Sequence, residues 1–229
     1  MADVAASIIE GTFREMCVTA SDIYMHLPTL RGVASRCDVI AEFGVRGIVS
    51  TWAFLAGFLD GKTSKDDERR LYCVDIEDID MNTVKSVAAD VGIRTEFIHC
   101  DSAKVKLPEQ VDLLFIDTWH IYAHLKRELA AHHNNVRKHI IMHDTEVDGV
   151  VGESVRLGLD CEKQAEMSGY PIDEIKKGLK LAVDEFLDLH GDEWVMTHHF
   201  IENNGLTILT RRSALDKAPQ EPVQPVHVE

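Results

Sequence analysis

The sequence is short of basic residues, and this shortage limits the partners that it can bind. It carries 24 Lys and Arg against 39 Asp and Glu among 229 residues, a formal net charge of −15. A charge of this sign repels phosphate backbones and anionic lipid surfaces. We therefore expect neither a nucleic acid nor a membrane as a partner.

Paired cysteines and long apolar runs are also missing. The five cysteines are scattered, odd in number and without a C-x-x-C pair, which argues against a disulfide framework and a structural zinc site. No apolar run approaches the roughly 20 residues of a membrane span, and no cationic leader with an apolar stretch opens the chain. We expect a soluble, cytoplasmic protein.

Apolar runs alternate with helical patterns along most of the chain, whose length suits one α/β domain. This order predicts a doubly wound, mostly parallel sheet with right-handed crossovers. A polar segment at 61–69 predicts an exposed loop. We expect strands at 38–42, 71–75, 95–100, from 111 and around 140, with helices at 2–17, from about 50, at 82–91 and after 120.

The C-terminal third begins with glycine-spaced residues, 149–169, which indicate an excursion from the sheet. Pro171 predicts the start of one helix that Gly191 ends. The runs 194–201 and 206–210 flank Asn203-Asn204-Gly205, a hairpin signal. We divide the chain into an N-terminal helical cap or lid at 1–37, a main domain at 38–212 and a proline-rich, disordered tail at 213–229.

Two apolar runs end in acids with histidines beside them. Asp117 ends the run from Val111, and Asp144 ends the run from Ile140. In open α/β sheets, ligands bind in the crevice where such strand ends converge. Together with His120 and His143, these acids predict a metal centre or an acid/base centre.

A glycine turn lies between the first strand and the next helix, which Ser50 or Thr51 could cap. Gly44 and Gly47 would let a ligand approach the backbone, near the free N–H groups of the helix. Asp75 ends the next strand and is placed to bind a ribose diol. The dinucleotide fingerprint G-x-G-x-x-G, with an acid about 20 residues on, is incomplete. An acid before the turn, Glu42, suits the cationic amino-acid end of S-adenosylmethionine better than a pyrophosphate.

In these motifs the sequence resembles the class I S-adenosylmethionine-dependent methyltransferases. The closer likeness is to the branch that includes cephalosporin-hydroxylase-type proteins and metal-dependent sugar O-methyltransferases. The resemblance implies a Rossmann-like, seven-stranded sheet whose last strand is antiparallel. The matching segments, 22–30, 42–47, 115–120, 143–145 and 203–207, span most of residues 20–212.

The resemblance also implies roles for individual residues. Asp75 would hold the ribose, Asp101 and Ser102 would lie by the adenine, and the remaining cofactor contacts would come from Glu42, Gly44, Gly47, Ser50 and Asp117. Asp117 and Asp144 would bind a divalent cation, Mg²⁺ or Mn²⁺, and His120 would be the general base. His143 could bind the cation, orient Asp144 or only pack. The acceptor would be a small hydroxylated molecule, a sugar or glycoside.

Other interpretations stay open. His120, His143 and one carboxylate could instead hold Fe(II) in a hydroxylase, or the chain could be a cofactor-binding subunit without turnover. The N-terminal helix could pack against another copy in a homo-oligomer. Trp119 could wall the pocket, residues 22–26 could fold over the acceptor, and we expect His124, His132 and His133 to be surface or packing residues.

Overall fold

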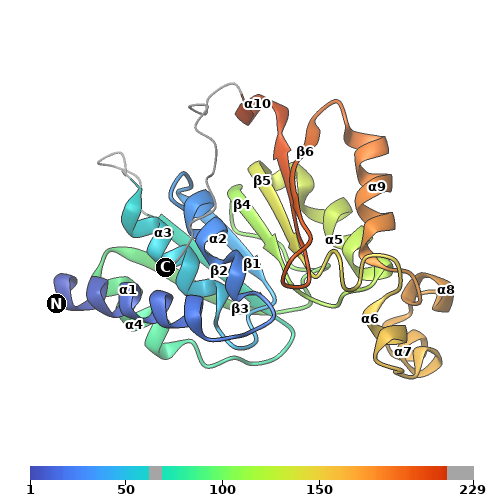
Figure 1. Ribbon diagram of the computed structural model, residues 1–229, viewed down its shortest axis with the longest axis horizontal. Coiled ribbons are helices and arrows are strands. Elements are labelled where there is room, and N and C mark those ends of the chain that lie inside the picture. Colours follow the sequence, from blue (N-terminus) through green and yellow to red (C-terminus); the bar gives the residue numbers. More distant parts are fainter. Residues whose placement is uncertain (62–68, 216–229) are drawn as a thin grey trace.

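Seven strands form one sheet in the order β3-β2-β1-β4-β5-β7-β6 (Figure 1). The computed structural model describes residues 1–61 and 69–215. Strands β1 to β5 pair in parallel, and β7 is antiparallel to both of its neighbours. The predicted sheet, mostly parallel with an antiparallel last strand, is confirmed. Its strands are β1 Val39–Phe43, β2 Arg69–Asp75, β3 Ile93–His99, β4 Val111–Ile116, β5 Val136–His143, β6 Trp194–Phe200 and β7 Leu206–Arg211.

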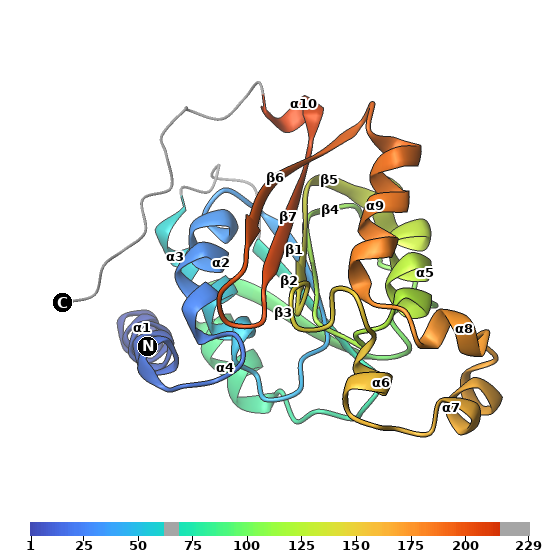
Figure 2. The ribbon, with the colours of Figure 1, turned by 45° about the vertical axis from the view of Figure 1, so that its right-hand side comes forward.

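Helices cover both faces of the sheet (Figure 2). The central strands β1 and β4 are buried along their whole length, as strands covered on both faces must be. One core lies between the sheet and α2, α3 and α4, with α1 outermost, and the other lies under α5 and α9. The helices of these layers are α1 Ala2–Val18, α2 Leu27–Ala34, α3 Ser50–Asp60, α4 Asn82–Asp90, α5 Tyr122–His132 and α9 Leu179–His190.

Short helices complete the described chain. Three of them, α6 to α8, form the excursion after β5, at the lower right of Figure 1. This excursion lies at the end of the sheet where β5 ends and the β6–β7 hairpin turns. The short helices are η1 Tyr24–His26, η2 His133–Asn135, α6 Glu153–Arg156, α7 Cys161–Ser168, α8 Ile172–Ile175 and α10 Arg212–Leu215.

The single helix predicted from Pro171 to Gly191 is wrong, because α8 and α9 are separate. Lys177 pairs with Val151 in an isolated antiparallel bridge, which a helical backbone could not form. At Gly178 an added Cβ would lie 2.4 Å from the carbonyl oxygen of Asp148. Residues 177 and 178, at the break, therefore pack against the start of the excursion. Helical periodicity does not predict a tertiary contact of this kind.

The predicted hairpin between β6 and β7 is confirmed. Asn203, Asn204 and Gly205 have φ values of 44°, 70° and 94°. Asparagine and glycine adopt this left-handed region at the least cost, so the sequence at the turn matches its backbone.

The structure tests the predictions for the two ends of the chain only in part. Ile9 and Leu27, within the predicted cap, belong to the buried core, and a lid role for residues 1–37 stays a prediction. Residues 213–215 of the predicted tail lie in α10; the rest of that tail and loop residues 62–68 lie outside the described residues. None of the helices in the described ranges is long and apolar enough to cross a membrane.

Candidate functional site

The glycine turn after β1 is pressed against the residue that follows β4. Gly44 has φ +85°, and an added Cβ would lie 1.8 Å from the backbone oxygen of Asp117. Two backbone hydrogen bonds fix this approach. The Gly44 N–H donates to the carbonyl oxygen of Val74 at 2.9 Å, and the Asp117 N–H donates to the carbonyl oxygen of Phe43 at 2.8 Å. Only glycine fits here, so the turn and the acid form one unit.

A cavity of about 730 Å³ opens beside this unit. Asp75 faces it at the end of β2, where one carboxylate oxygen accepts the Val45 N–H at 2.7 Å and the other accepts the Glu77 N–H at 2.9 Å. Asp75 thus holds the glycine turn as well as lining the cavity. The cavity brings together most of the residues predicted to bind the cofactor: Gly44, Gly47, Ser50, Asp75, Asp101, Ser102 and Asp117.

Glu42, by contrast, does not line the cavity. Its side chain is fully buried under α3, where it accepts hydrogen bonds from Ser50 at 2.5 Å and Thr51 at 2.8 Å. The predicted cap is therefore wrong: Val49 is the N-cap, and neither hydroxyl caps α3. Burial raises the pKa of Glu42 to about 7, against the lowering effect of these hydroxyls and the Cys73 thiol. Glu42 fixes the start of α3 from beneath it and is not among the residues that line the cavity.

Polar side chains also lie beneath the other end of the cavity. The Ser102 hydroxyl donates to the buried Glu128 carboxylate at 2.6 Å, and Thr118 donates to the same oxygen at 2.9 Å. His124 Nε2 lies 3.0 Å from Ser102 Oγ. The expectation that His124 is a surface or packing residue is incomplete, since it is buried and lines the cavity; His132 and His133 are also buried.

Asp117, His120 and Asp144 converge at the edge of the cavity. His120 Nε2 lies 3.0 Å from Asp117 Oδ1 and 3.1 Å from Asp144 Oδ2. One donor atom from each of the three residues lies within 4.8 Å of the others, a spacing that a metal ion could bridge. Asp144 has φ +57°, in the left-handed region that few non-glycine residues other than asparagine and aspartate adopt.

His143 lies next to this group and is not part of it. Its Nδ1 is 3.4 Å from Asp117 and 3.3 Å from Asp144, and its Nε2 is 3.2 Å from the Asn203 carbonyl oxygen. The side chain is fully buried and does not line the cavity. Of the roles left open by the sequence, this arrangement fits best with orienting the two acids.

The acids control the charge of His120. Burial lowers its pKa, but the hydrogen bond and charge of Asp117, with the charges of Asp144 and Glu153, outweigh burial and raise the pKa to about 9. At neutral pH the imidazole therefore carries a proton and takes the place of a cation among the carboxylates. A divalent cation bound by the same oxygens would compete with that proton.

Two acids near His120 were not singled out from the sequence. Asp148 Oδ2 lies 3.6 Å and Glu153 Oε2 lies 3.7 Å from His120 Nδ1. Asp148 directly precedes the glycine-spaced excursion 149–169, and Glu153 lies within it. Their place in the site depends on how that loop folds back, although two acids so soon after a candidate ligand were an available signal.

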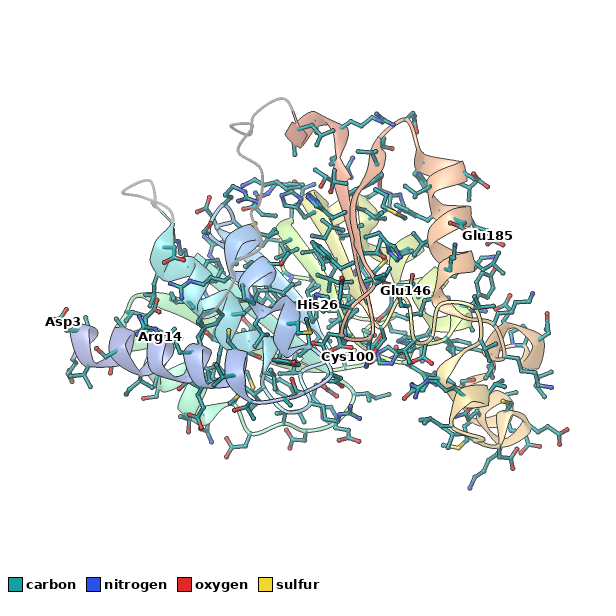
Figure 3. All side chains as sticks on the ribbon, in the orientation of Figure 1. Asp3, Arg14, His26, Cys100, Glu146 and Glu185 are labelled. Carbon is teal, nitrogen blue, oxygen red and sulfur yellow. The ribbon has the colours of Figure 1, made fainter. Side chains whose placement is uncertain are left out.

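Aromatic and N-terminal residues complete the walls. Trp119 and Tyr170 stack with their ring centroids 6.0 Å apart, and both line the cavity. On another side, the side-chain oxygen Oδ1 of Asn203, in the hairpin, accepts the Met25 N–H at 2.9 Å. The carbonyl oxygen of Asn203 also contacts His26, which Figure 3 marks near the lower end of the sheet. The hairpin therefore holds the N-terminal segment beside the site.

Comparison with known proteins establishes the fold. No family model matches the chain, and no curated protein matches its sequence. The S-adenosylhomocysteine-bound methyltransferase PaMTH1 of Podospora anserina aligns at TM-score 0.53 and 12% identity, covering 89% of this chain and 87% of that one. The O-methyltransferase TomG of Streptomyces achromogenes, in complex with S-adenosylmethionine, aligns at 0.51 and 14%, covering 90% and 89%.

An N-methyltransferase is equally similar. The 1,6-didemethyltoxoflavin N1-methyltransferase of Burkholderia thailandensis aligns at TM-score 0.52 and 14% identity, covering 92% of this chain and 88% of that one. The chain therefore has the fold of the class I S-adenosylmethionine-dependent methyltransferases. Since proteins that methylate oxygen and nitrogen share it, the acceptor atom must be argued from the site.

The contact between Gly44 and Asp117 can be tested by substitution. We expect Gly44→Ala to lower the free energy of unfolding by roughly 3 kcal/mol or more, because the new Cβ meets backbone that cannot move aside. Gly92→Ala is the matched control, with φ +75° and open space around it; it should cost about 1 kcal/mol. Urea denaturation measures both, and equal losses would contradict the proposed close approach.

Burial of Glu42 predicts a pH-dependent gain from Glu42→Gln. The pKa of Glu42 rises on folding from 4.5 to about 7, so ionising it costs stability as the pH rises through this window. The glutamine variant avoids that cost. Relative to the wild type, it should gain about 2 kcal/mol in free energy of unfolding between pH 5 and pH 8. The exposed Asp78→Asn is the control, and a flat difference for Glu42→Gln would refute the prediction.

Proposed function

We propose that this protein is an S-adenosylmethionine-dependent O-methyltransferase, assisted by a divalent cation, that acts on a small hydroxylated acceptor. The observation that carries this proposal is the double position of Asp117. Asp117 lines the cavity, and its carboxylate also belongs to the group that could hold a cation. A methyl donor and an acceptor oxygen would therefore meet at one residue.

The chemistry of the cavity fits the cofactor. Asp75 closes β2 and faces the cavity as an acceptor for a ribose diol, and the turn between Gly44 and Gly47 leaves room for a ligand against the backbone. Asp101 and Ser102 lie at the end of β3, on the side assigned to the adenine. The solved proteins of this fold that contain the cofactor or its product support this placement.

The donor set fits a cation that accepts oxygen ligands. The carboxylates of Asp117 and Asp144 match Mg²⁺ or Mn²⁺, which both prefer oxygen ligands, and this leaves the His120 imidazole to take a proton. Asp117 and Asp144 would hold the ion, which would lower the pKa of the acceptor hydroxyl. No observation favours the Fe(II) hydroxylase, because His143 does not line the cavity and is not one of the three residues whose ligand atoms converge.

In the proposed reaction, an oxygen–carbon bond forms between the acceptor and the methyl group. The sulfur–carbon bond breaks with its electron pair going to sulfur, which turns the sulfonium into the thioether of S-adenosylhomocysteine. The acceptor proton goes to the His120 imidazole, which lines the cavity. His120 must be neutral to take this proton, and a cation held by Asp117 and Asp144 would favour the neutral imidazole by offsetting the carboxylate charge that holds its proton.

We further propose a sugar or glycoside as the acceptor. Trp119 and Tyr170 give the cavity a stacked aromatic wall, and acids lie at its edge. Aromatic faces pack against apolar ring surfaces, and carboxylates accept hydroxyl hydrogen bonds. The resemblance to sugar O-methyltransferases supports the same class.

Cofactor binding should depend on Asp75. We expect Asp75→Asn to weaken S-adenosylhomocysteine binding roughly 10- to 100-fold, because the amide replaces one acceptor oxygen of the carboxylate. Isothermal titration calorimetry gives the affinity. Asp78→Asn, an exposed acid three residues on, is the matched control. Unchanged affinity in the Asp75 variant would show that this carboxylate does not contact the ligand.

Turnover should depend on His120 and on a cation. With a panel of sugars, mass spectrometry should detect a methylated product and S-adenosylhomocysteine in equal amounts, lost with EDTA and restored by Mn²⁺ or Mg²⁺. His120→Gln should slow transfer by about 100-fold or more and leave cofactor affinity unchanged. His198→Gln, an exposed histidine, is the control. Cation-independent transfer would remove the metal from the proposal.

A further inference from the structure

The excursion after β5 contributes a buried ion pair to the site. Asp148 is fully buried, and Arg156 grips it with two hydrogen bonds, Nε to Oδ1 at 2.6 Å and a terminal nitrogen to Oδ2 at 2.8 Å. The Arg156 side chain is 37% exposed, so the pair reaches from solvent to the interior. A fully buried carboxylate is costly unless it is paired in this way.

The pair is built into the backbone around it. The Asp148 N–H donates to the backbone carbonyl oxygen of Asp144 at 3.0 Å, and the Asp148 carbonyl oxygen accepts the Leu179 N–H at 2.9 Å. The position of the carboxylate is therefore set by both ends of the excursion. Glu153 is held differently, since it lies at the start of the four-residue helix α6 and lines the cavity.

His120 lies between two pairs of carboxylates. Its Nε2 faces Asp117 and Asp144, and its Nδ1 lies within 4 Å of Asp148 and Glu153 and of no other carboxylate among the described residues. A histidine that uses one ring nitrogen for a metal or a proton usually donates the other N–H to a carboxylate, which fixes its orientation.

We propose that Asp148, held by Arg156, is the positioning residue that orients His120 toward Asp117 and Asp144. This inference rests on the proposed function, because it assigns the acceptor proton to His120 Nε2. The 3.6 Å separation between Asp148 Oδ2 and His120 Nδ1 is an ion-pair distance, so the carboxylate attracts the charged ring without a direct hydrogen bond. Since Arg156 balances the charge of Asp148, the Asp148–Arg156 pair adds little net negative charge to the site.

The first readout is methyl transfer, followed as kcat and as KM for the sugar. Asp148→Asn keeps the side-chain shape but removes the charge that faces His120 and weakens the grip of Arg156, so we expect kcat to fall about 10- to 100-fold with little change in KM. Asp173→Asn, an exposed acid of the same excursion, is the control and should change kcat by less than about threefold. Arg156→Lys, which keeps the charge and loses the fork, should fall between them.

Two binding measurements separate positioning of the base from damage to the site: calorimetry with S-adenosylhomocysteine, and Mn²⁺ affinity followed by the electron paramagnetic resonance signal of free Mn²⁺. Both affinities should stay at the wild-type value in Asp148→Asn. If this variant loses either affinity, Arg156→Lys takes its place in the test. Wild-type kcat in both variants would overturn the inference and leave the proposed function intact. If the wild type binds S-adenosylhomocysteine but methylates no sugar, the proposed function and this inference fall together.

Discussion

The close approach of Gly44 to the backbone of Asp117 is the constraint on which the rest of the site depends. It brings the turn after β1 against the end of β4, and thereby places a cofactor-sized cavity next to the acids. Any side chain at Gly44 would separate these parts. The fold thus uses the absence of a Cβ to join the region where a methyl donor would bind to the residues that could activate an acceptor.

The second theme is how an acidic protein keeps carboxylates inside. Hydrogen-bond donors stabilise these buried acids. Glu42 and Glu128 each accept two hydroxyl hydrogen bonds, and Asp148 accepts its hydrogen bonds from an arginine. Asp117 and Asp144 share two histidines, His120 and His143, as partners. Histidine can give up its proton, so this group could exchange an imidazolium for a metal ion.

The sequence predicted the sheet and the acid-bearing strand ends because these depend on local patterns. Apolar runs that end in Asp117 or Asp144 require only the order of residues, and the asparagines and glycine of the hairpin match the φ values that the turn needs. The break before Gly178 and the inward turn of Glu42 could not be read in this way. Both depend on residues distant in the sequence, which pattern and propensity do not place.

A crystal structure of the protein grown with S-adenosylhomocysteine and Mn²⁺ tests the central claim most directly. The account predicts the ligand over the Gly44 turn, with its ribose at Asp75. It also predicts an anomalous peak for Mn²⁺ in contact with the Asp117 and Asp144 carboxylates. A cavity without the ligand, or Mn²⁺ bound away from both acids, would contradict it.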